Sequence, residues 1–420
     1  MANVFIVAAK RTPFGAFGNP HVYMAHSTPK RRIILAHLND QLARGKLKDY
    51  TAAELGAFAS KAALADVGKQ VPIDSVIVGN VAHTDAAGPY LARHVGLRSG
   101  LDITVPALTV NRLCGSGFQS VINAAHEIIV GDANIVLTGG AESMSLAPYA
   151  LRNIRFGGTR FGVDLKLEDT LAAALVDRFP KETPMGITAE NLSQEHKISR
   201  QECDEYALMS QQRWAAANKA GRFNAEITPV EYKVKKTMET LSHDEHPRPQ
   251  TTIETLAKLP SVFKKEGAVT AGNASGISDG AGAIIVASDQ AVKEHGLKPL
   301  AKVVSWHVTA VDPSIMGIGP VTAIQGALKK AGLTLKDMDL IEVNEAFAAQ
   351  YLAVEKVLGL DRNKTNLNGG AIALGHPLGA SGSRILAHLT HELQRTQGKY
   401  AIGSACIGGG QGIAVILERC

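Results

Sequence analysis

Apolar residues recur with two different spacings along this chain, and the spacing changes several times within the first 140 residues. Short apolar runs predict buried strands, and apolar positions three and four apart predict helices that pack against them. In one such helix, Val121, Ile122, Ala125, Ile128 and Ile129 share a single face. The strands are expected at 4–8, 74–81, 108–111 and 135–137, the last ending at Gly139-Gly140, and the helices at 51–67 and 116–130.

The last third of the chain repeats the order of elements found in the first third. Residues 62–81 resemble residues 327–343, each being a helix followed by a buried strand. Residues 110–140 resemble residues 366–410, where a tight turn and a helix lead to a glycine-rich strand end. An internal duplication of this kind predicts two similar α/β halves packed together.

The middle of the chain, residues 147–268, has a different composition. It is richer in charged residues, Pro and Met, and it contains helical stretches such as 200–220. We interpret it as a loop domain inserted into a sheet domain, because strand-like, glycine-rich sequence returns at 269–287. The expected division is an N-terminal domain at 1–290, which includes the insertion, and a C-terminal domain at 296–420.

The charge and cysteine usage exclude several classes of protein. The net charge is +5, and segment 19–48 accounts for all of it with six Lys and Arg residues against one Asp. A neutral body with one basic segment does not indicate a nucleic-acid-binding protein. No apolar run reaches the roughly 18–20 residues of a membrane span. The four cysteines form no CxxC pair, which argues against a zinc ribbon or a disulfide framework and favours thiol chemistry in a reducing compartment.

Cys114 is the first candidate for chemistry. It lies in Asn111-Arg-Leu-Cys-Gly-Ser-Gly, between the strand expected at 108–111 and the helix expected at 116–130. A helix N-terminus offers free N–H groups and the positive end of the helix dipole, which favour a thiolate over a thiol. The same position also suits a buried structural cysteine, the commoner role of a lone Cys, and this context alone leaves both roles open.

His376 is the second candidate, in Asn368-Gly-Gly-Ala-Ile-Ala-Leu-Gly-His-Pro-Leu-Gly. Few other polar side chains surround it, so a solvated surface position is not expected. It suits a base for a nearby thiol and a donor to a developing oxyanion. A core histidine bonded to a backbone carbonyl is the alternative.

Two further segments have the composition of a site. Cys406 lies in Gly403-Ser-Ala-Cys-Ile-Gly-Gly-Gly, whose glycines can expose N–H groups as an oxyanion hole; a small buried residue is the alternative. Asn344-Glu345 ends a buried strand at 340–343, and binding groups collect at strand ends in α/β sheets. A simple turn is the alternative there.

Three other patterns indicate no site. The glycine-rich stretch 272–282 lacks the Lys-Ser/Thr of a P-loop, and Gly408-Gly-Gly-Gln-Gly has no βαβ unit after it. His388-Leu-Thr-His-Glu does not have the order of a metalloprotease motif and lies on an expected amphipathic helix. We therefore expect neither a metal nor a dinucleotide.

Taken together, these segments resemble the thiolase family over nearly the whole chain. The resemblance implies an α/β thiolase fold: two similar βαβαβαββ-type halves packed as a layered α/β/α/β/α structure, with an inserted loop domain. Besides the Cys114 and Cys406 segments, it rests on Gly139-Gly-Ala-Glu-Ser-Met-Ser, Thr270-Ala-Gly-Asn-Ala-Ser-Gly, Asn344-Glu-Ala-Phe-Ala, Gly375-His-Pro-Leu-Gly-Ala-Ser-Gly, Arg152-Asn-Ile-Arg-Phe-Gly and His246-Pro-Arg-Pro-Gln-Thr-Thr.

The activity that the resemblance implies is an acyl transfer. Members of this branch of the family cleave a 3-oxoacyl-CoA with a second CoA in fatty-acid β-oxidation, by a ping-pong mechanism through an acyl-cysteine. Cys114 is similar to the nucleophile, His376 to its activator and Cys406 to the acid/base. Asn344 is similar to the residue that holds a water, with His376, in one oxyanion hole, and the N–H groups of Cys114 and Gly408 correspond to the second hole.

CoA is expected as a co-substrate, with no tightly bound cofactor. The positions that match CoA contacts of the family are Arg248, Thr251 and Ser275, with Met185 and Phe347 near the pantetheine. The family is usually dimeric or tetrameric, so we expect a homodimer or homotetramer. A mitochondrial matrix location is expected first and a peroxisomal one second, because the chain does not end in Ser-Lys-Leu and 30–38 matches a peroxisomal nonapeptide only partly.

Segment 19–48 departs from the family, which connects the first strand and first helix with about 25 fewer residues. A surface insertion, an unstructured basic loop and a gene-model error remain open. Two functional alternatives also remain. One is an acetoacetyl-CoA thiolase with the same catalytic motifs, and the other is a catalytically silent acyl-CoA-binding protein of the same fold.

Overall fold

The computed structural model describes residues 3–17, 45–68 and 71–420. Most of the insertion expected at 19–48 lies outside these residues. The described chain contains one ten-stranded mixed sheet, with nine strands in the order β14-β15-β16-β13-β1-β12-β5-β3-β4 and β2 (Gly15–Ala16) paired to β12.

The sheet divides into two groups of strands, one from each half of the chain. Among the described strands, the groups join where β1 pairs with β13, at Phe5 with Lys302 and Ile6 with Ala301. The prediction of two similar α/β halves is thereby confirmed. The N-terminal group contains β1 (Val4–Arg11), β3 (Ser75–Gly79), β4 (Ala107–Val110), β5 (Ile135–Ser143) and β12 (Ser278–Ser288), and the C-terminal group contains β13 (Ala301–Ala310), β14 (Leu340–Val343), β15 (Tyr400–Ile407) and β16 (Gln411–Arg419).

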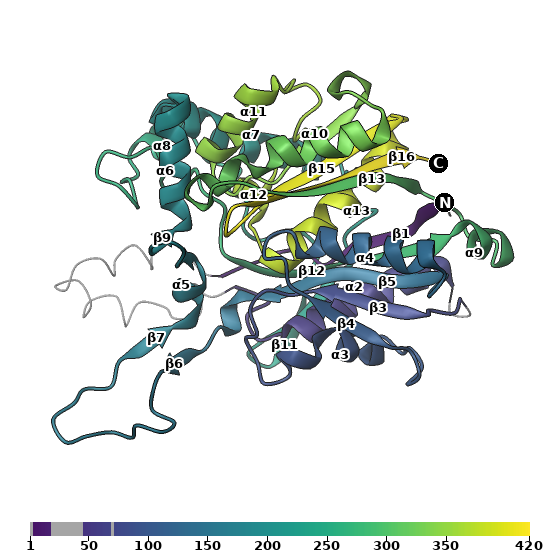
Figure 1. Ribbon diagram of the computed structural model, residues 1–420, viewed down its shortest axis with the longest axis horizontal. Coiled ribbons are helices and arrows are strands. Elements are labelled where there is room, and N and C mark those ends of the chain that lie inside the picture. Colours follow the sequence, from purple (N-terminus) through teal and green to yellow (C-terminus); the bar gives the residue numbers. More distant parts are fainter. Residues whose placement is uncertain (1–2, 18–44, 69–70) are drawn as a thin grey trace.

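Helices form three layers around the two strand groups (Figure 1). One pair covers the outer face of the N-terminal group, one pair lies between the groups, and one pair covers the outer face of the C-terminal group. This is the layered α/β/α/β/α arrangement expected. In that order the pairs are α2 (Ala52–Val67) and α3 (Leu91–Arg98), α4 (Ser116–Val130) and α13 (Leu378–Thr396), and α10 (Gly319–Ala331) and α11 (Ala348–Leu358).

Local sequence explains where the first long helices begin and end. The Thr51 hydroxyl accepts from the N–H of Glu54, and the Glu54 carboxylate accepts from the N–H of Thr51, so a capping box starts α2. Helix α4 has the bounds predicted for it and ends at Gly131, whose φ of 88° is left-handed. Both ends are therefore set by residues within one turn of the helix.

One expectation about the middle layer was wrong. Strand β5 does not end at its two glycines but continues to Ser143, because a side chain at Gly140 would collide with the backbone of Gly379 in α13 and glycine lets the strand pass beneath the helix. Helix α13 is amphipathic as expected, and it is nevertheless buried on nearly all sides because strands flank it on two faces.

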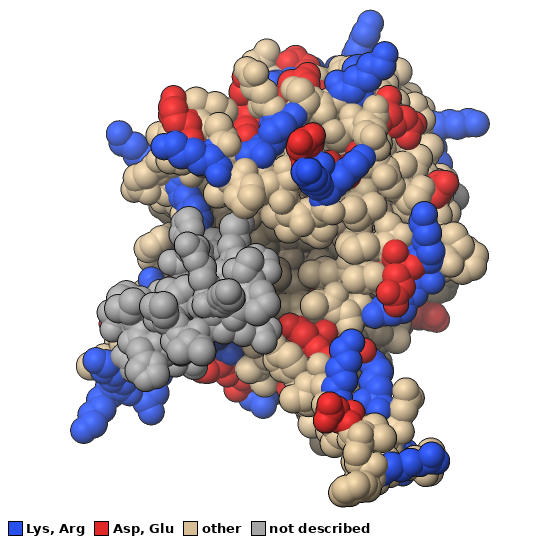
Figure 2. Space-filling model, turned by 90° about the vertical axis from the view of Figure 1, so that its left-hand side faces the viewer, with Lys and Arg blue, Asp and Glu red and all other residues tan. Residues whose placement is uncertain are grey.

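The helices of the inserted loop domain pack beside the C-terminal half, residues 230–241 pack against the N-terminal half, and an arm extends away from both (Figure 1). The face that carries this arm is hollowed; uncharged residues line the hollow, and both basic and acidic residues lie around it (Figure 2). The described elements of the insertion are β6 (Tyr149–Leu151), β7 (Leu167–Asp169), α5 (Thr170–Ala174), β8 (Val176–Asp177), β9 (Thr183–Pro184), α6 (Met185–His196), α7 (Arg200–Lys219), β10 (Val230–Val234), β11 (Thr237–Leu241) and α8 (Ile253–Ala257).

A buried ion cluster ties the insertion to the sheet. Arg11 at the end of β1 is fully buried and donates to Glu226 at 2.7 Å and to both oxygens of Asp244 at 2.7 and 3.0 Å. Glu226 also bonds His388 of α13 at 2.8 Å. Burial opposes the charge of Glu226, yet His388 and Arg11 lower its pKa to about 2.

Replacing Arg11 by Met should strongly destabilise the protein, because Glu226 and Asp244 would remain buried without their cation. We expect a loss of about 3–5 kcal/mol in the free energy of unfolding, measured by urea denaturation. Lys293→Met is the matched control, since Lys293 forms an exposed pair with Asp289 worth less than about 1 kcal/mol. Equal losses in the two variants would contradict this account of the cluster.

Candidate active site

Cys114 lies in the tight connection between β4 and α4. Leu113 before it has a φ of 47°, in the left-handed region that non-glycine residues rarely adopt. Ser116 stabilises this turn, because its hydroxyl donates to the carbonyl of Leu113 at 2.7 Å and accepts from the N–H of Arg112 at 2.9 Å. Strained turns of this kind cluster at functional sites, and this one fixes the position of Cys114.

The C-terminal half closes around this turn. A side chain at Gly115 would collide with Ile407 at the end of β15, and one at Gly117 would collide with the backbone of α13. Cys114 packs in an apolar cluster with Leu378, the first residue of α13. The two glycines therefore allow elements of both halves to meet at Cys114.

Cys406 is the second thiol of the site and is fully buried in β15. Burial raises the pKa of Cys406 most, and the charge of Cys114 raises it further, so the two candidate thiols are within electrostatic reach of each other. Both residues are thiols at neutral pH in the free protein.

The electrostatics of Cys114 differ from the prediction. Burial raises the pKa of Cys114 to about 11, although hydrogen bonds from the N–H groups of Gly408 and of Cys114 itself lower it. The expectation that the helix N-terminus favours a thiolate was therefore wrong for the free protein, because desolvation outweighs these N–H groups. A thiolate at Cys114 would therefore require a base that takes its proton.

His376 lies one residue before the N-cap of α13 and is buried. Its own N–H donates to the carbonyl of Gly276 at 2.8 Å, which anchors its backbone. Burial, followed by the charge of Arg384, lowers the pKa of His376 to about 4. The imidazole is thus neutral at physiological pH and able to accept a proton.

The hydrogen bonds of His376 indicate which ring nitrogen is the base. Ser381 Oγ lies 2.6 Å from Nδ1 and 3.1 Å from the carbonyl of Pro377; when its proton goes to Pro377, Nδ1 carries the ring proton and donates to Ser381. At the other nitrogen, the side-chain N–H₂ of Asn344 lies 3.4 Å from Nε2. In this tautomer the lone pair of the neutral ring is on Nε2, on the side of Asn344. Ser381 was not among the predicted site residues, because the sequence alone did not show what its hydroxyl contacts.

Asn344 connects His376 to the C-terminal strands. It follows β14, and its N–H donates to the carbonyl of Ser404 in β15 at 2.9 Å. Its side-chain oxygen is buried and has no hydrogen-bond partner among the described residues. A buried amide with a free acceptor beside a neutral imidazole is suited to hold a water or a substrate oxygen.

The residues expected to bind CoA fall into two groups. Met185, the first residue of α6, and Phe347 pack in the cluster that contains Cys406, and the N–H of Ser275 donates to Ala346 of the same cluster at 3.0 Å. The structure therefore brings these three residues to the cluster of Cys406.

Arg248 and Thr251 form the second group. They lie in the insertion before α8, where the Thr251 hydroxyl donates to the Arg248 carbonyl at 2.7 Å. Arg248 is exposed, and its N–H donates to the side chain of Gln211 at 2.8 Å. Among the described residues, no hydrogen bond or ion pair joins Arg248 or Thr251 to the thiols.

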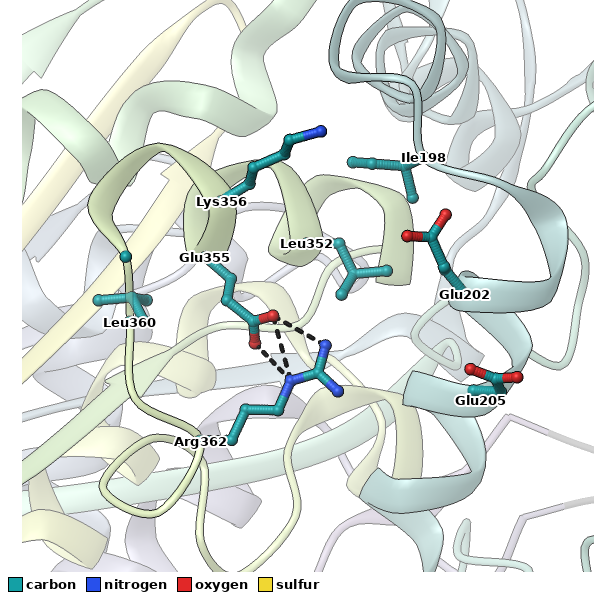
Figure 3. Close-up of a pocket in the computed structure, with 9 residues that line it drawn as sticks. Ile198, Glu202, Glu205, Leu352, Glu355, Lys356, Leu360 and Arg362 are labelled. Atoms are coloured by element: carbon teal, nitrogen blue, oxygen red, sulfur yellow. Dashed lines mark hydrogen bonds and ion pairs between the residues drawn. The ribbon is translucent and has the colours of Figure 1, made fainter.

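A surface pocket of about 380 Å³ between α7 and α11 does not belong to this site. Glu355 pairs with Arg362 on its wall at 2.8 Å, and Glu202, Glu205 and Lys356 also line it (Figure 3). None of the predicted catalytic residues lines this pocket. Within residues 3–17, 45–68 and 71–420, no group of three or more His, Cys, Asp and Glu side chains could hold a metal ion, and no helix is long and apolar enough to cross a membrane.

Comparison with known proteins gives the family. The sequence matches "Thiolase, N-terminal domain" over residues 32–290 and "Thiolase, C-terminal domain" over residues 297–419. Human mitochondrial 3-ketoacyl-CoA thiolase is 61% identical over 420 residues, which cover 100% of this chain and 98% of the relative. Beta-ketothiolase BktB of Cupriavidus necator is 50% identical over 379 residues, which cover 89% of this chain and 95% of the relative.

Solved structures agree with these matches. The crystal structure of the human mitochondrial 3-ketoacyl-CoA thiolase in complex with CoA has a TM-score of 0.90 at 61% identity, and the match covers 100% of this chain and 99% of that one. The chain belongs to the thiolase family.

Changing Asn344 to Asp should raise the pKa of His376, because a carboxylate beside Nε2 favours the protonated ring. The acidic limb of the kcat/KM profile for 3-oxoacyl-CoA cleavage should then move to higher pH by roughly one to three units. Asn368→Asp is the control, since Asn368 forms an equivalent buried pair with His388 at 2.9 Å outside the site. An unmoved acidic limb in Asn344→Asp would refute the assignment of Nε2 as the base.

Proposed function

We propose that this protein is an acyltransferase that cleaves 3-oxoacyl-CoA with CoA, releasing acetyl-CoA and an acyl-CoA shortened by two carbons, in fatty-acid β-oxidation. The observation that carries the proposal is the meeting of two thiols from opposite halves, the half-buried Cys114 and the buried Cys406, where Cys114 packs against Leu378, two residues after the neutral, buried His376. The 61% identity to the mitochondrial 3-ketoacyl-CoA thiolase over the full chain supports the same substrate class.

The first half-reaction uses both thiols. His376 Nε2 takes the proton of Cys114, and the resulting thiolate attacks the C3 carbonyl of the substrate. The C2–C3 bond breaks, the acyl group stays on Cys114, and the electron pair moves onto C2 of the leaving thioester enolate. Cys406 donates its proton to C2, which gives acetyl-CoA and leaves a thiolate at Cys406 and an imidazolium at His376.

The second half-reaction restores the site. The thiolate of Cys406 takes the proton of an incoming CoA thiol, and the CoA sulfur attacks the acyl thioester on Cys114. The expelled Cys114 sulfur regains its proton from the imidazolium of His376. Each residue returns to its neutral starting form, in agreement with pKa shifts that disfavour every charged form at rest.

Two oxyanion holes stabilise the charges that develop in these steps. The N–H groups of Gly408 and Cys114 point at the Cys114 sulfur and are placed to donate to the oxyanion formed on the attacked carbonyl. His376 and a water held by Asn344 are placed to stabilise the enolate oxygen of acetyl-CoA. Loss of one donor from such a site typically costs about 10²–10³-fold in rate.

CoA binding involves the insertion and the C-terminal half. We assign Met185 and Phe347 to the pantetheine, because they pack against the Cys406 cluster, and Ser275 to the polar part of the same channel. Arg248 and Thr251 would bind the nucleotide end, which must lie away from the thiols. The N-terminal domain at 1–290, with its insertion, would supply Cys114 and all of these CoA contacts except Phe347. The C-terminal domain at 296–420 would supply Phe347 and the other catalytic groups.

The proposal places the protein in mitochondria, as the names of its human, mouse and bovine relatives do for those proteins. We also propose that the protein is a homo-oligomer, because two exposed surfaces of the chain are suited to contact a second copy of it. Phe156 and Phe161 on the arm between β6 and β7 are almost wholly exposed, at 97% and 108%. The edge strand β4 pairs on one side only and exposes Leu108.

Sedimentation velocity should therefore show a dimer or a tetramer. If the arm joins dimers, exchanging Phe156 and Phe161 for Ser should reduce a tetramer to a dimer without unfolding it, since both side chains are exposed in one chain. A wild-type monomer at micromolar concentration would refute the oligomer.

Cleavage of 3-oxoacyl-CoA substrates of four to sixteen carbons should be observed with CoA present, and Cys114→Ala should abolish it at every length, because no acyl-enzyme can form. The assay follows loss of the 3-oxoacyl-CoA enolate absorbance. Activity on the four-carbon substrate alone would instead identify an acetoacetyl-CoA thiolase. Binding of CoA without turnover of any substrate would identify a silent acyl-CoA-binding protein.

A further inference from the structure

Glu142, the next-to-last residue of β5, is a buried carboxylate that the reaction steps above do not use. It is fully buried, and each of its oxygens accepts two hydrogen bonds. Oε1 accepts from the side chain of Asn80 at 3.1 Å and the N–H of Ala82 at 3.0 Å. Oε2 accepts from the N–H of Val81 at 3.1 Å and the N–H of Gly379 at 2.7 Å.

One of these four donors belongs to the other half of the chain. Gly379 is in the first turn of α13, three residues after His376, so the carboxylate bonds the segment that carries the base. The contact is possible because backbone meets backbone here: a side chain at Gly140 would collide with the carbonyl of Gly379, and one at Gly379 would collide with Glu142 itself.

The other donors lead to the nucleophile. Val81 and Ala82 form the loop after β3, and the carbonyl of Val81 accepts from the side chain of Asn111 at 3.1 Å. The side-chain oxygen of Asn111 in turn accepts from the N–H of Leu113 at 2.9 Å, inside the turn that presents Cys114. Three linked groups thus run from Glu142 to the residue before the nucleophile.

We propose that Glu142 is a positioning residue: from β5 its carboxylate holds the start of α13 and the loop after β3 together, and so fixes His376 relative to Cys114. This inference rests on the proposed function, because the distance between His376 and Cys114 affects the rate only if His376 takes the proton of Cys114. A misplacement of about 1 Å between reacting groups can cost 10²-fold in rate, so a fixed link between the halves has a direct catalytic effect.

A carboxylate is the group that this position requires. All four neighbours are N–H donors, and an amide at residue 142 would turn an N–H₂ toward two of them. The negative charge opposes catalysis in one respect, since Glu142 is among the groups that raise the pKa of Cys114. Burial raises the pKa of Glu142 itself to about 7, although the N–H groups of Ala82, Gly379 and Val81 lower it. Positioning and charge therefore act in opposite directions on the nucleophile, and an experiment can separate them.

The test uses two variants of the full-length protein with opposite changes. Glu142→Gln keeps the length but removes the charge, whereas Glu142→Asp keeps the charge but shortens the reach. Both should lower kcat for 3-oxoacyl-CoA cleavage by about 10²-fold, with the KM for CoA little changed, because the reacting groups are displaced and the CoA contacts are not. The rate of iodoacetamide alkylation of Cys114 against pH should shift to lower pH in Glu142→Gln only.

Two further variants keep the test decisive. Asn111→Ala interrupts the same link at an exposed residue, so it should fold even if the buried substitutions do not, and it should lower kcat several-fold. Asp74→Asn is the matched control, because Asp74 accepts from the N–H groups of Asn134 and Ile135 at the opposite end of β5 and should leave kcat unchanged.

The outcomes separate this inference from the proposed function. Wild-type kcat in Asn111→Ala, or in either folded Glu142 variant, overturns the positioning role. Activity that falls only in proportion to the folded fraction, measured by circular dichroism, with the alkylation profile of Glu142→Gln unshifted, also overturns it. No turnover by the wild type would instead count against the proposed function, and the alkylation profiles would still report the coupling of Glu142 to Cys114.

Discussion

The close approach of helix α13 to strand β5 and helix α4 is the constraint on which the site depends. Gly117, Gly140 and Gly379 have no side chains where these three elements cross, and a Cβ at any of them would collide with a neighbouring backbone or with Glu142. Because the contact is made by backbone, the two halves of the chain approach more closely than packed side chains would allow. The segments that carry the candidates Cys114 and His376 thereby meet, and Leu378, two residues after His376, packs in the apolar cluster of Cys114.

Burial is the second constraint, and it determines the form of the chemistry. It raises the pKa values of Cys114 and Cys406 and lowers that of His376, so all three groups are neutral at rest. A preformed thiolate–imidazolium pair is therefore disfavoured, and charge develops only as protons move between groups during turnover. The N–H groups of Gly408 and Cys114 are already in place for that charge, so little reorganisation is needed when it appears.

The sequence predicted those features that depend on short stretches of chain. The bounds of α4, the turn at Cys114, the two-half architecture and the candidates Cys114, His376 and Cys406 all follow from local motifs and spacing. The features that it did not predict depend on contacts distant in sequence. Strand β5 continues past Gly139 and Gly140 because α13 crosses the strand at that point. The thiol of Cys114 is not ionised because burial of the thiol raises its pKa.

The positioning groups Ser381 and Glu142 were not identified from the sequence for the same reason. Ser381 and Glu142 occupy recognisable motifs, but a carboxylate that bonds an N–H 237 positions away gives no local signal. Long-range partners of this kind explain why motif residues beyond the three catalytic side chains are needed. The insertion at 19–48 is a different case, because most of it lies outside the described residues.

The most direct test of the account is to trap the acyl-enzyme. The protein should be mixed with a sixteen-carbon 3-oxoacyl-CoA in the absence of free CoA and analysed by mass spectrometry after proteolysis. We predict a shortened acyl group on the peptide that contains Cys114, one acetyl-CoA released per acylated site, and loss of the adduct when CoA is added. Acylation of Cys406 instead, or turnover with no covalent adduct at Cys114, would contradict the assignment of the two thiols.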